Sequence, residues 1–163
     1  MNGCSRLREL PASLVSLASL ETLNLWGCMA LAGDFSTANA LKQVDLSGCS
    51  KLIELPTSLV GLASVEVLNL WGCVGLARLP DDFSAALAKA LKQIDLSGCS
   101  KLAEAARFLA TLASLERLNL SRCMALTKLP DVFSTAKALK EVNNPSRDVD
   151  TTVAKALDAG ANY

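Results

Sequence analysis

Apolar residues recur along this chain in one frame, which can be written L-x-x-L-x-L-x-x-C-x-x-L. Two copies show it clearly: residues 41–52 read LKQVDLSGCSKL, and residues 65–76 read VEVLNLWGCVGL. The same frame returns from Leu20, Leu91 and Leu115, and a decayed copy begins at Leu139 and stops matching after Val142. Such self-similarity indicates a repeat architecture, in which each unit buries its apolar face against its neighbours.

The L-x-L part of the frame alternates apolar and polar residues, which is the period of a strand with one buried face. Val44 and Leu46 are therefore expected to point inward. Asp45 and Ser47 are expected to point outward. We predict parallel strands near residues 21–26, 43–47, 66–71, 92–97 and 116–121 in a single sheet, with the L-x-L leucines buried, including Leu46, Leu70, Leu96 and Leu120.

The segments between the strands carry the signals of a return path. Proline tolerates the first turn of a helix, so it favours a short helical return after the turn; it occurs at Pro11, Pro56, Pro80 and Pro130. Two additional residues near 85–90 predict a longer helix there. Residues 31–35 have lost the usual L-P pair, and alanines replace it at 105–106. Residues 41–52 and 91–102 differ at one position only, which indicates that a pair of coils was duplicated.

The six cysteines occupy one equivalent position in each copy: Cys4, Cys28, Cys49, Cys73, Cys99 and Cys123. An even number of cysteines in a small chain can indicate disulfides. One position per coil instead predicts a column of buried, reduced thiols, which fits a reducing compartment. Cys4 is the expected exception, because its coil is incomplete. A metal site is disfavoured, since the chain has no C-x-x-C pair and no histidine.

The frame, with the L-P that often follows it, resembles the leucine-rich repeat over residues 2 to about 142. Cysteine at the ladder position followed by L-x-x-L-P resembles most closely the cytoplasmic plant-type disease-resistance receptors. This resemblance implies an α/β solenoid, an arc with a parallel β-sheet on its concave face and short helices or irregular turns on its convex face. It also implies a cytoplasmic protein, with a ladder residue that is buried and helps to satisfy the turn backbone.

The ends of the chain depart from the frame. Residues 1–142 are expected to hold an incomplete first coil, five near-complete coils and a decayed last coil, and residues 143–163 a C-terminal helical cap or the start of a following region. Residues 150–158 suit an amphipathic helix with Asp150 as its N-cap. Residues 153–162 faintly resemble the second helix of an ankyrin repeat. Residues 1–4 match Leu46–Cys49, so the chain begins in mid-coil, and association through this uncapped end is a possible contact.

Composition narrows the function classes. Sixteen basic and 16 acidic residues balance to zero net charge, which leaves no long-range field to attract nucleic acid or an anionic membrane. Without histidine the chain lacks the commonest general base. It also lacks a spanning apolar run, a secretory h-region and the nucleotide-binding pattern G-x-x-x-x-G-K-[ST]. We therefore expect no enzymatic activity, no cofactor and no metal.

The outward strand positions supply the candidate binding residues. Glutamate and lysine alternate from coil to coil, which predicts a solvated, self-neutralised ladder; its members are Glu21, Lys42, Glu66, Lys92, Glu116 and Lys140. A second stripe is rich in acceptors and either hydrogen-bonds a partner or keeps the face soluble; it consists of Asn24, Asp45, Asn69, Asp95 and Asn119. Arg117 and Arg122 complete the polar candidates.

Trp26 and Trp71, the only tryptophans, share one outward column with Ser47 between them, and Ser97 and Ser121 follow. An exposed tryptophan is unusual, and tryptophan is enriched among binding hot spots. Two of them, about 10 Å apart on alternate strands, would flank a shallow notch over Ser47. The alternative is that both descend from one ancestral coil and merely cover Gly27 and Gly72.

Two hypotheses about function follow. The first is a protein-recognition module that binds a partner protein on its concave face, as the sensor part of an immune-receptor-like protein would, with neither nucleic acid nor a membrane as partner. The second is a structural spacer, or an inert fragment of a larger repeat protein, with no ligand of its own. Exposure of the two tryptophans on the concave face would favour the first hypothesis over the second.

Overall fold

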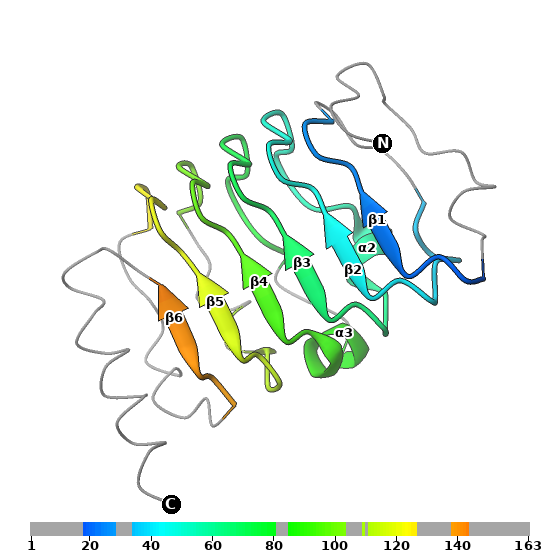
Figure 1. Ribbon diagram of the computed structural model, residues 1–163. Coiled ribbons are helices and arrows are strands. Elements are labelled where there is room, and N and C mark those ends of the chain that lie inside the picture. The colour runs from blue at the N-terminus through cyan, green and yellow to red at the C-terminus, as the bar shows by residue number, and fades with distance from the viewer. Residues whose placement is uncertain are drawn as a thin grey trace, which may run out of the picture.

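The computed structural model describes residues 18–28, 34–80, 85–103, 109, 111–126 and 138–143. They form a six-stranded, all-parallel sheet whose spatial order follows the sequence, as Figure 1 shows. The strands are β1 (Thr22–Asn24), β2 (Gln43–Asp45), β3 (Val67–Asn69), β4 (Gln93–Asp95), β5 (Arg117–Asn119) and β6 (Glu141–Asn143). Two short helices, α2 (Thr57–Val60) and α3 (Ala85–Ala90), lie on return segments. The predicted fold class, a solenoid built on a parallel sheet, is confirmed.

The strands pair in the register that the repeat frame predicts. Leu23 lies opposite Val44, and Val44 lies opposite Leu68, so equivalent frame positions always meet. Each strand has only three residues, but the hydrogen bonds between coils continue past it. The Leu25 N–H donates to the Asp45 carbonyl oxygen at 2.8 Å. Backbone pairing therefore covers most of each predicted strand range.

The sixth strand was not among the five predicted. The frame stops matching after Val142, so side-chain pattern alone gave no strand there. Pairing needs main-chain groups rather than a particular side chain, and the Leu120 N–H donates to the Asn143 carbonyl oxygen at 2.8 Å. β6 thus runs one residue beyond the predicted end of the repeats at 142.

The core is a stack of leucines on the inner side of the sheet. The predicted inward residues Leu46, Leu70, Leu96 and Leu120 are all 0% exposed. In the coil whose residues 31–35 lack the L-P pair, Phe35 is also fully buried. Its N–H donates to the Ser58 hydroxyl oxygen of the next coil at 3.1 Å. This coil therefore contributes a phenylalanine to a core made mostly of leucines.

A tight turn after each strand joins the sheet to the return segment. In the first described coil the Cys28 N–H donates to the Leu25 carbonyl oxygen at 3.1 Å. Gly27 between them has φ +69°, a left-handed conformation that glycine adopts without steric cost. Glycine with positive φ recurs at the equivalent positions Gly48, Gly72 and Gly98.

The cysteine thiols link each turn to the one before it. The Cys49 Sγ–H donates to the Leu25 carbonyl oxygen at 3.5 Å, so this oxygen accepts from its own turn and from the next coil. A carbonyl oxygen has two lone pairs and can accept both. The same bond recurs from Cys73 to Leu46 at 3.2 Å, from Cys99 to Leu70 at 3.3 Å and from Cys123 to Leu96 at 3.1 Å. The five described cysteines are buried and free, as predicted.

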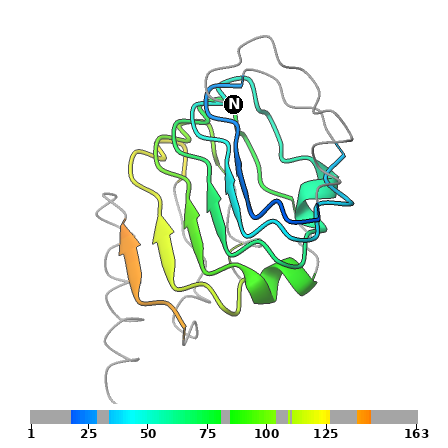
Figure 2. The same cartoon turned by 45° about the vertical axis from the view of Figure 1, so that its right-hand side comes forward.

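The return segments lie on the side away from the sheet, and in Figure 2 α2 is seen opposite the strands. Pro56 stands directly before α2 with φ −56°, and its carbonyl oxygen accepts from the N–H of Leu59 at 3.0 Å. The longer helix predicted near residues 85–90 is α3. Within the described residues, no helix is long and apolar enough to cross a bilayer.

Several predictions fall outside the described residues. These are the accessible Cys4, the uncapped N-terminal end, the returns at Pro11 and Pro130, the alanines at 105–106, and the C-terminal helix over residues 150–158.

Replacing Leu96 by alanine is expected to lower the free energy of unfolding by about 2–5 kcal/mol, because it removes buried methyl groups and leaves a cavity. Ile53→Ala is the matched control, since Ile53 is 65% exposed and its truncation should change stability by about 0.5 kcal/mol or less. Chemical denaturation of both variants decides the point. Equal stability of the two would contradict the packing described here.

The thiol column makes stability sensitive to alkaline pH. Burial raises the pKa of Cys49 from 9.0 to about 11, and that of Cys73 to about 12. The unfolded chain loses these protons at lower pH than the folded state. The free energy of unfolding should therefore keep its full value below about pH 9. It should then decline towards pH 11–12, by about 1.4 kcal/mol per pH unit for each thiol. Denaturation curves from pH 7 to 11 measure the slope.

The rate at which the thiols are labelled provides a control for the dependence of stability on pH. At neutral pH the five described cysteines should react with a thiol reagent only as fast as the protein unfolds, because the thiolate is the reactive form. Rapid labelling of all cysteines in the folded protein would show that the column is open to solvent.

Candidate functional site

The solvent-facing side of the six-stranded sheet, called the concave face below, carries four columns of side chains with one residue from each coil. The charged column consists of Glu21, Lys42, Glu66, Lys92, Glu116 and Lys140. The mixed column consists of Thr22, Gln43, Val67, Gln93, Arg117 and Glu141. The Asx column consists of Asn24, Asp45, Asn69, Asp95, Asn119 and Asn143. The turn column consists of Trp26, Ser47, Trp71, Ser97 and Ser121.

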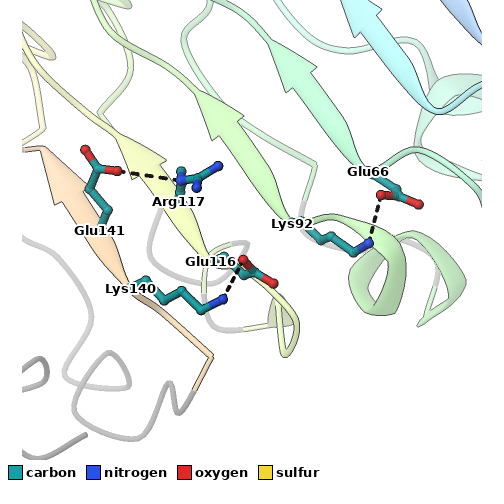
Figure 3. Close-up of polar contacts among 6 residues, drawn as sticks. All are labelled: Glu66, Lys92, Glu116, Arg117, Lys140 and Glu141. Atoms are coloured by element: carbon teal, nitrogen blue, oxygen red, sulfur yellow. Dashed lines mark hydrogen bonds and ion pairs between the residues drawn. The ribbon is translucent and has the colours of Figure 1, made fainter. Parts of the chain in front are cut away.

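The charged column neutralises itself in pairs. Each lysine ammonium contacts the glutamate of the preceding coil: Lys42 with Glu21 at 2.6 Å, Lys92 with Glu66 at 2.8 Å and Lys140 with Glu116 at 2.9 Å. Figure 3 shows the last two pairs. Hydrogen bonds to the glutamates raise the pKa of Lys42 and of Lys92, and the bond from Lys140 lowers the pKa of Glu116. The pairs are largely exposed, so each adds little to stability.

The Asx column holds the turns in place. Asn24 Oδ1 accepts the Trp26 N–H at 3.0 Å, and Asp45 Oδ1 accepts the Ser47 N–H at 2.9 Å. The same bond, two residues along the chain, recurs at Asn69, Asp95 and Asn119. It is the Asx turn, in which a short side chain takes the place of a backbone acceptor. These residues were proposed from sequence as partner contacts, and the structure shows that one oxygen of each already serves the fold.

The two aspartates also contact a neighbouring coil. Asp45 Oδ2 accepts from the Asn24 side-chain amide at 3.1 Å, and Asp95 Oδ2 accepts from that of Asn119 at 3.2 Å. Within the described part of the chain, neither carboxylate takes part in an ion pair. Asp45 and Asp95 therefore present negative charge that no cation compensates there.

Both tryptophans are exposed, as predicted: Trp26 is 47% and Trp71 51% accessible. The Trp26 indole lies across the next coil, since its Nε1 is 3.4 Å from the position that a Cβ on Gly48 would take. The glycine that it covers is thus Gly48, where the alternative hypothesis expected Gly27.

The predicted notch over Ser47 is wrong. Ser47 is only 4% exposed and Ser97 only 7%, although both belong to the outward turn column. Each follows a coil that carries a tryptophan, whereas Ser121 follows a coil that carries a serine and is half-buried. The hydroxyl of Ser47 donates to Asp45 Oδ1 at 2.6 Å, and that of Ser97 donates to Asp95 Oδ1 at 2.5 Å, so both buried hydroxyls are satisfied within their own turns. The two tryptophans are therefore exposed with no open serine notch between them.

A hollow of about 290 Å³ lies farther along the concave face, over β3 to β6. Its polar rim includes Arg117, whose Nε lies 3.7 Å from Glu141 Oε2 (Figure 3). The lining comes from the mixed column, the Asx column and the strand residues between them: Val67, Leu68, Asn69, Gln93, Ile94, Asp95, Arg117, Leu118, Asn119, Glu141 and Asn143.

The structure brings only some of the sequence candidates together in this hollow. Asn69, Asp95, Asn119 and Arg117 line it, whereas Trp26, Trp71, Asn24, Asp45 and Arg122 do not. Besides the buried strand residues Leu68, Ile94 and Leu118, sequence reasoning did not name Val67, Gln93, Glu141 and Asn143 as candidates. Val67, Gln93 and Glu141 occupy the third position of the frame, which was not read as a column. Asn143 would have been found by continuing the Asx column one coil further.

The concave face offers contacts suited to a polypeptide. The hollow combines amide, carboxylate and guanidinium groups with the apolar side chain of Val67, and the two exposed indoles add N–H donors elsewhere on the same face. Among the described residues, no group of three or more potential metal ligands comes together.

Arg122 stands in the one described turn that lacks glycine, and its φ is +63°. A non-glycine residue in this region costs about 1–2 kcal/mol, and glycine's greater freedom in the unfolded chain offsets about 0.4–1 kcal/mol of that. Arg122→Gly should therefore stabilise the protein by about 0.5–1 kcal/mol, by difference. The matched reverse variant is Gly98→Ala at φ +76°, which should destabilise it. Thermal melts compare the two, and a lower melting temperature for Arg122→Gly would contradict the turn geometry.

Comparison of the chain with protein-family models and with curated proteins found no match. What the structure establishes is a parallel β-solenoid. Its coils are about 24 residues long, with cysteine-to-cysteine intervals of 21 to 26 residues. Leucine, asparagine or aspartate, and cysteine recur at fixed places in each coil.

Proposed function

We propose that this chain is a leucine-rich-repeat module that recognises a partner protein on its concave face. The observation that carries the proposal is the pair of tryptophans, each about half exposed and placed at equivalent positions two coils apart. Tryptophan is large and apolar, so leaving two of them in solvent has a cost that a partner would remove. Aromatic anchors of this kind supply much of the binding energy at protein interfaces.

The rest of the concave face supports recognition by contact. The charged column is already paired within itself, so it does not attract partners indiscriminately. The hollow over β3 to β6 lies on the same face and offers hydrogen-bonding groups beside apolar ones. Repeat proteins commonly bind through such extended surfaces, because the frame stays constant while the outward residues vary.

Three features support the finer assignment to the leucine-rich repeats, and within them to the cytoplasmic disease-resistance type. The frame L-x-x-L-x-L-x-x-C coincides with the strand, the turn and the buried ladder residue of each coil. The ladder cysteine bonds to the turn carbonyl of the preceding coil, which is the role that the resemblance implies. The free thiols are consistent with a reducing, cytoplasmic environment. On this proposal the chain is the sensor part of an immune-receptor-like protein.

The test is to replace each tryptophan by alanine and to titrate a partner, first captured from a lysate by the unmodified protein. Each variant should weaken binding by about 1–4 kcal/mol, because a hot-spot indole loses its contacts. Stability should change far less, since about half of each side chain is already in solvent. Thermal melts run alongside separate loss of binding from unfolding.

Ile53→Ala is the control, because it removes an exposed apolar side chain from a return segment and should leave binding unchanged. If both tryptophan variants melt and bind like the unmodified protein, recognition does not use these residues. If no partner is retained by any form, the result favours the alternative, a structural spacer or an inert fragment of a larger repeat protein.

A further inference from the structure

The spacing of the two exposed tryptophans is set by the backbone. At the turn column the Gly27 N–H donates to the Ser47 carbonyl oxygen at 2.8 Å, and the Gly48 N–H donates to that of Trp71 at 2.6 Å. The three coils are thus hydrogen-bonded at this level, so successive backbones lie one strand spacing apart. Two spacings place the backbones at Trp26 and Trp71 about 9.4–9.8 Å apart.

This distance selects among the conformations of a peptide that crosses the strands. In a polyproline II helix, residues three apart face the same side and are separated by about 9.3 Å. In an extended strand, same-side residues repeat at about 6.6–6.8 Å, so none coincides with the second indole. In an α-helix the nearest match is seven residues and about 10.5 Å. The polyproline II repeat therefore fits the coil-pair spacing most closely.

The side chains present also match such a peptide. Proline-rich segments dock on aromatic surfaces, because their backbone is already ordered and their rings are flat and apolar. The indole Nε1–H can donate to the peptide's carbonyl groups, which polyproline II leaves free of internal hydrogen bonds.

The charge around the tryptophans favours a basic peptide. Asp45 lies in the coil between the two tryptophans, and Asp95 lies in the coil after Trp71. Neither carboxylate has a cationic partner among the described residues, whereas the glutamates of the charged column are paired with lysines. Arg122, on the β5 coil, lies beyond this stretch. Basic side chains next to the prolines would meet the two uncompensated carboxylates.

We propose that a proline-rich, basic segment of a partner protein docks across the turns that follow β1 to β4. In this complex, prolines three residues apart stack on Trp26 and Trp71. An arginine or lysine between these prolines contacts Asp45, and one beyond the second proline contacts Asp95. The proposal rests on the recognition function proposed above, and it names the chemical class of the partner.

The probe is a synthetic peptide of Pro-Arg-Ala repeats, titrated into the full chain. Trp26 and Trp71 are the only tryptophans, so their fluorescence reports binding directly. Trp26→Ala and Trp71→Ala should each weaken binding about tenfold or more, and in each variant the remaining indole still reports. Asp45→Asn and Asp95→Asn should weaken it about two- to fivefold, since each removes one exposed charge pair. Asparagine already occupies the equivalent position at Asn24, Asn69 and Asn119, so these variants should keep the turn.

Two control peptides test the geometry and the charge. A peptide of the same composition with scrambled proline spacing should bind much more weakly, and so should one of Pro-Glu-Ala repeats. Added salt should weaken the binding of the basic peptide, because the contacts between its charges and the two aspartates are exposed to solvent. Equal binding of the scrambled peptide, or no binding of the Pro-Arg-Ala peptide, would overturn the proposal.

The two proposals can fail separately. If the proline peptide does not bind but the tryptophan variants lose the captured partner protein, the recognition site is right and the partner class is wrong. If the tryptophan variants keep the captured partner, the recognition function itself is wrong at this site.

Discussion

The carbonyl group of the last strand leucine in each coil is the point on which the rest of the structure depends. In the first described coil it is the Leu25 oxygen, which accepts the Cys28 N–H of its own turn and the Cys49 thiol of the next coil. An unsatisfied carbonyl buried here would be costly. The turn N–H satisfies one lone pair of this oxygen, and the thiol of the next coil satisfies the second where that coil carries the cysteine. These hydrogen bonds hold successive coils one strand spacing apart, and at that spacing the leucines of neighbouring coils stack on one another.

The same spacing organises the surface. Because every coil repeats at one strand distance, outward residues of equal frame position become columns, and duplication of a coil pair makes those columns alternate. Glutamate alternates with lysine and forms ion pairs, as between Glu66 and Lys92. Tryptophan alternates with serine, so two indoles stand two coils apart. The side-chain pattern of this face thus repeats every two coils, although the backbone repeats every coil.

The side chains of the Asx column form hydrogen bonds within the fold, whereas the two tryptophans remain largely available to a partner. One oxygen of Asp45 accepts hydrogen bonds from the N–H and the hydroxyl of Ser47. That oxygen stabilises the turn, which leaves less of the side chain free to contact a partner. The tryptophans keep about half their surface in water. Among the described residues they are the largest apolar side chains that the concave face leaves exposed, and for that reason we propose that recognition uses them.

The repeat frame alone predicted the parallel sheet, its register, the buried leucines and the reduced cysteine column, because a strand with one buried face leaves a period that side chains reveal directly. It predicted the exposure of Trp26 and Trp71 for the same reason. It could not predict the burial of Ser47, because that burial depends on how neighbouring coils pack, which position within one coil does not report. Nor could it find the sixth strand or Asn143, since main-chain groups pair without a side-chain signature. The hollow over β3 to β6 is likewise a product of stacking, which brings Val67, Gln93 and Arg117 together from three coils that are distant in sequence.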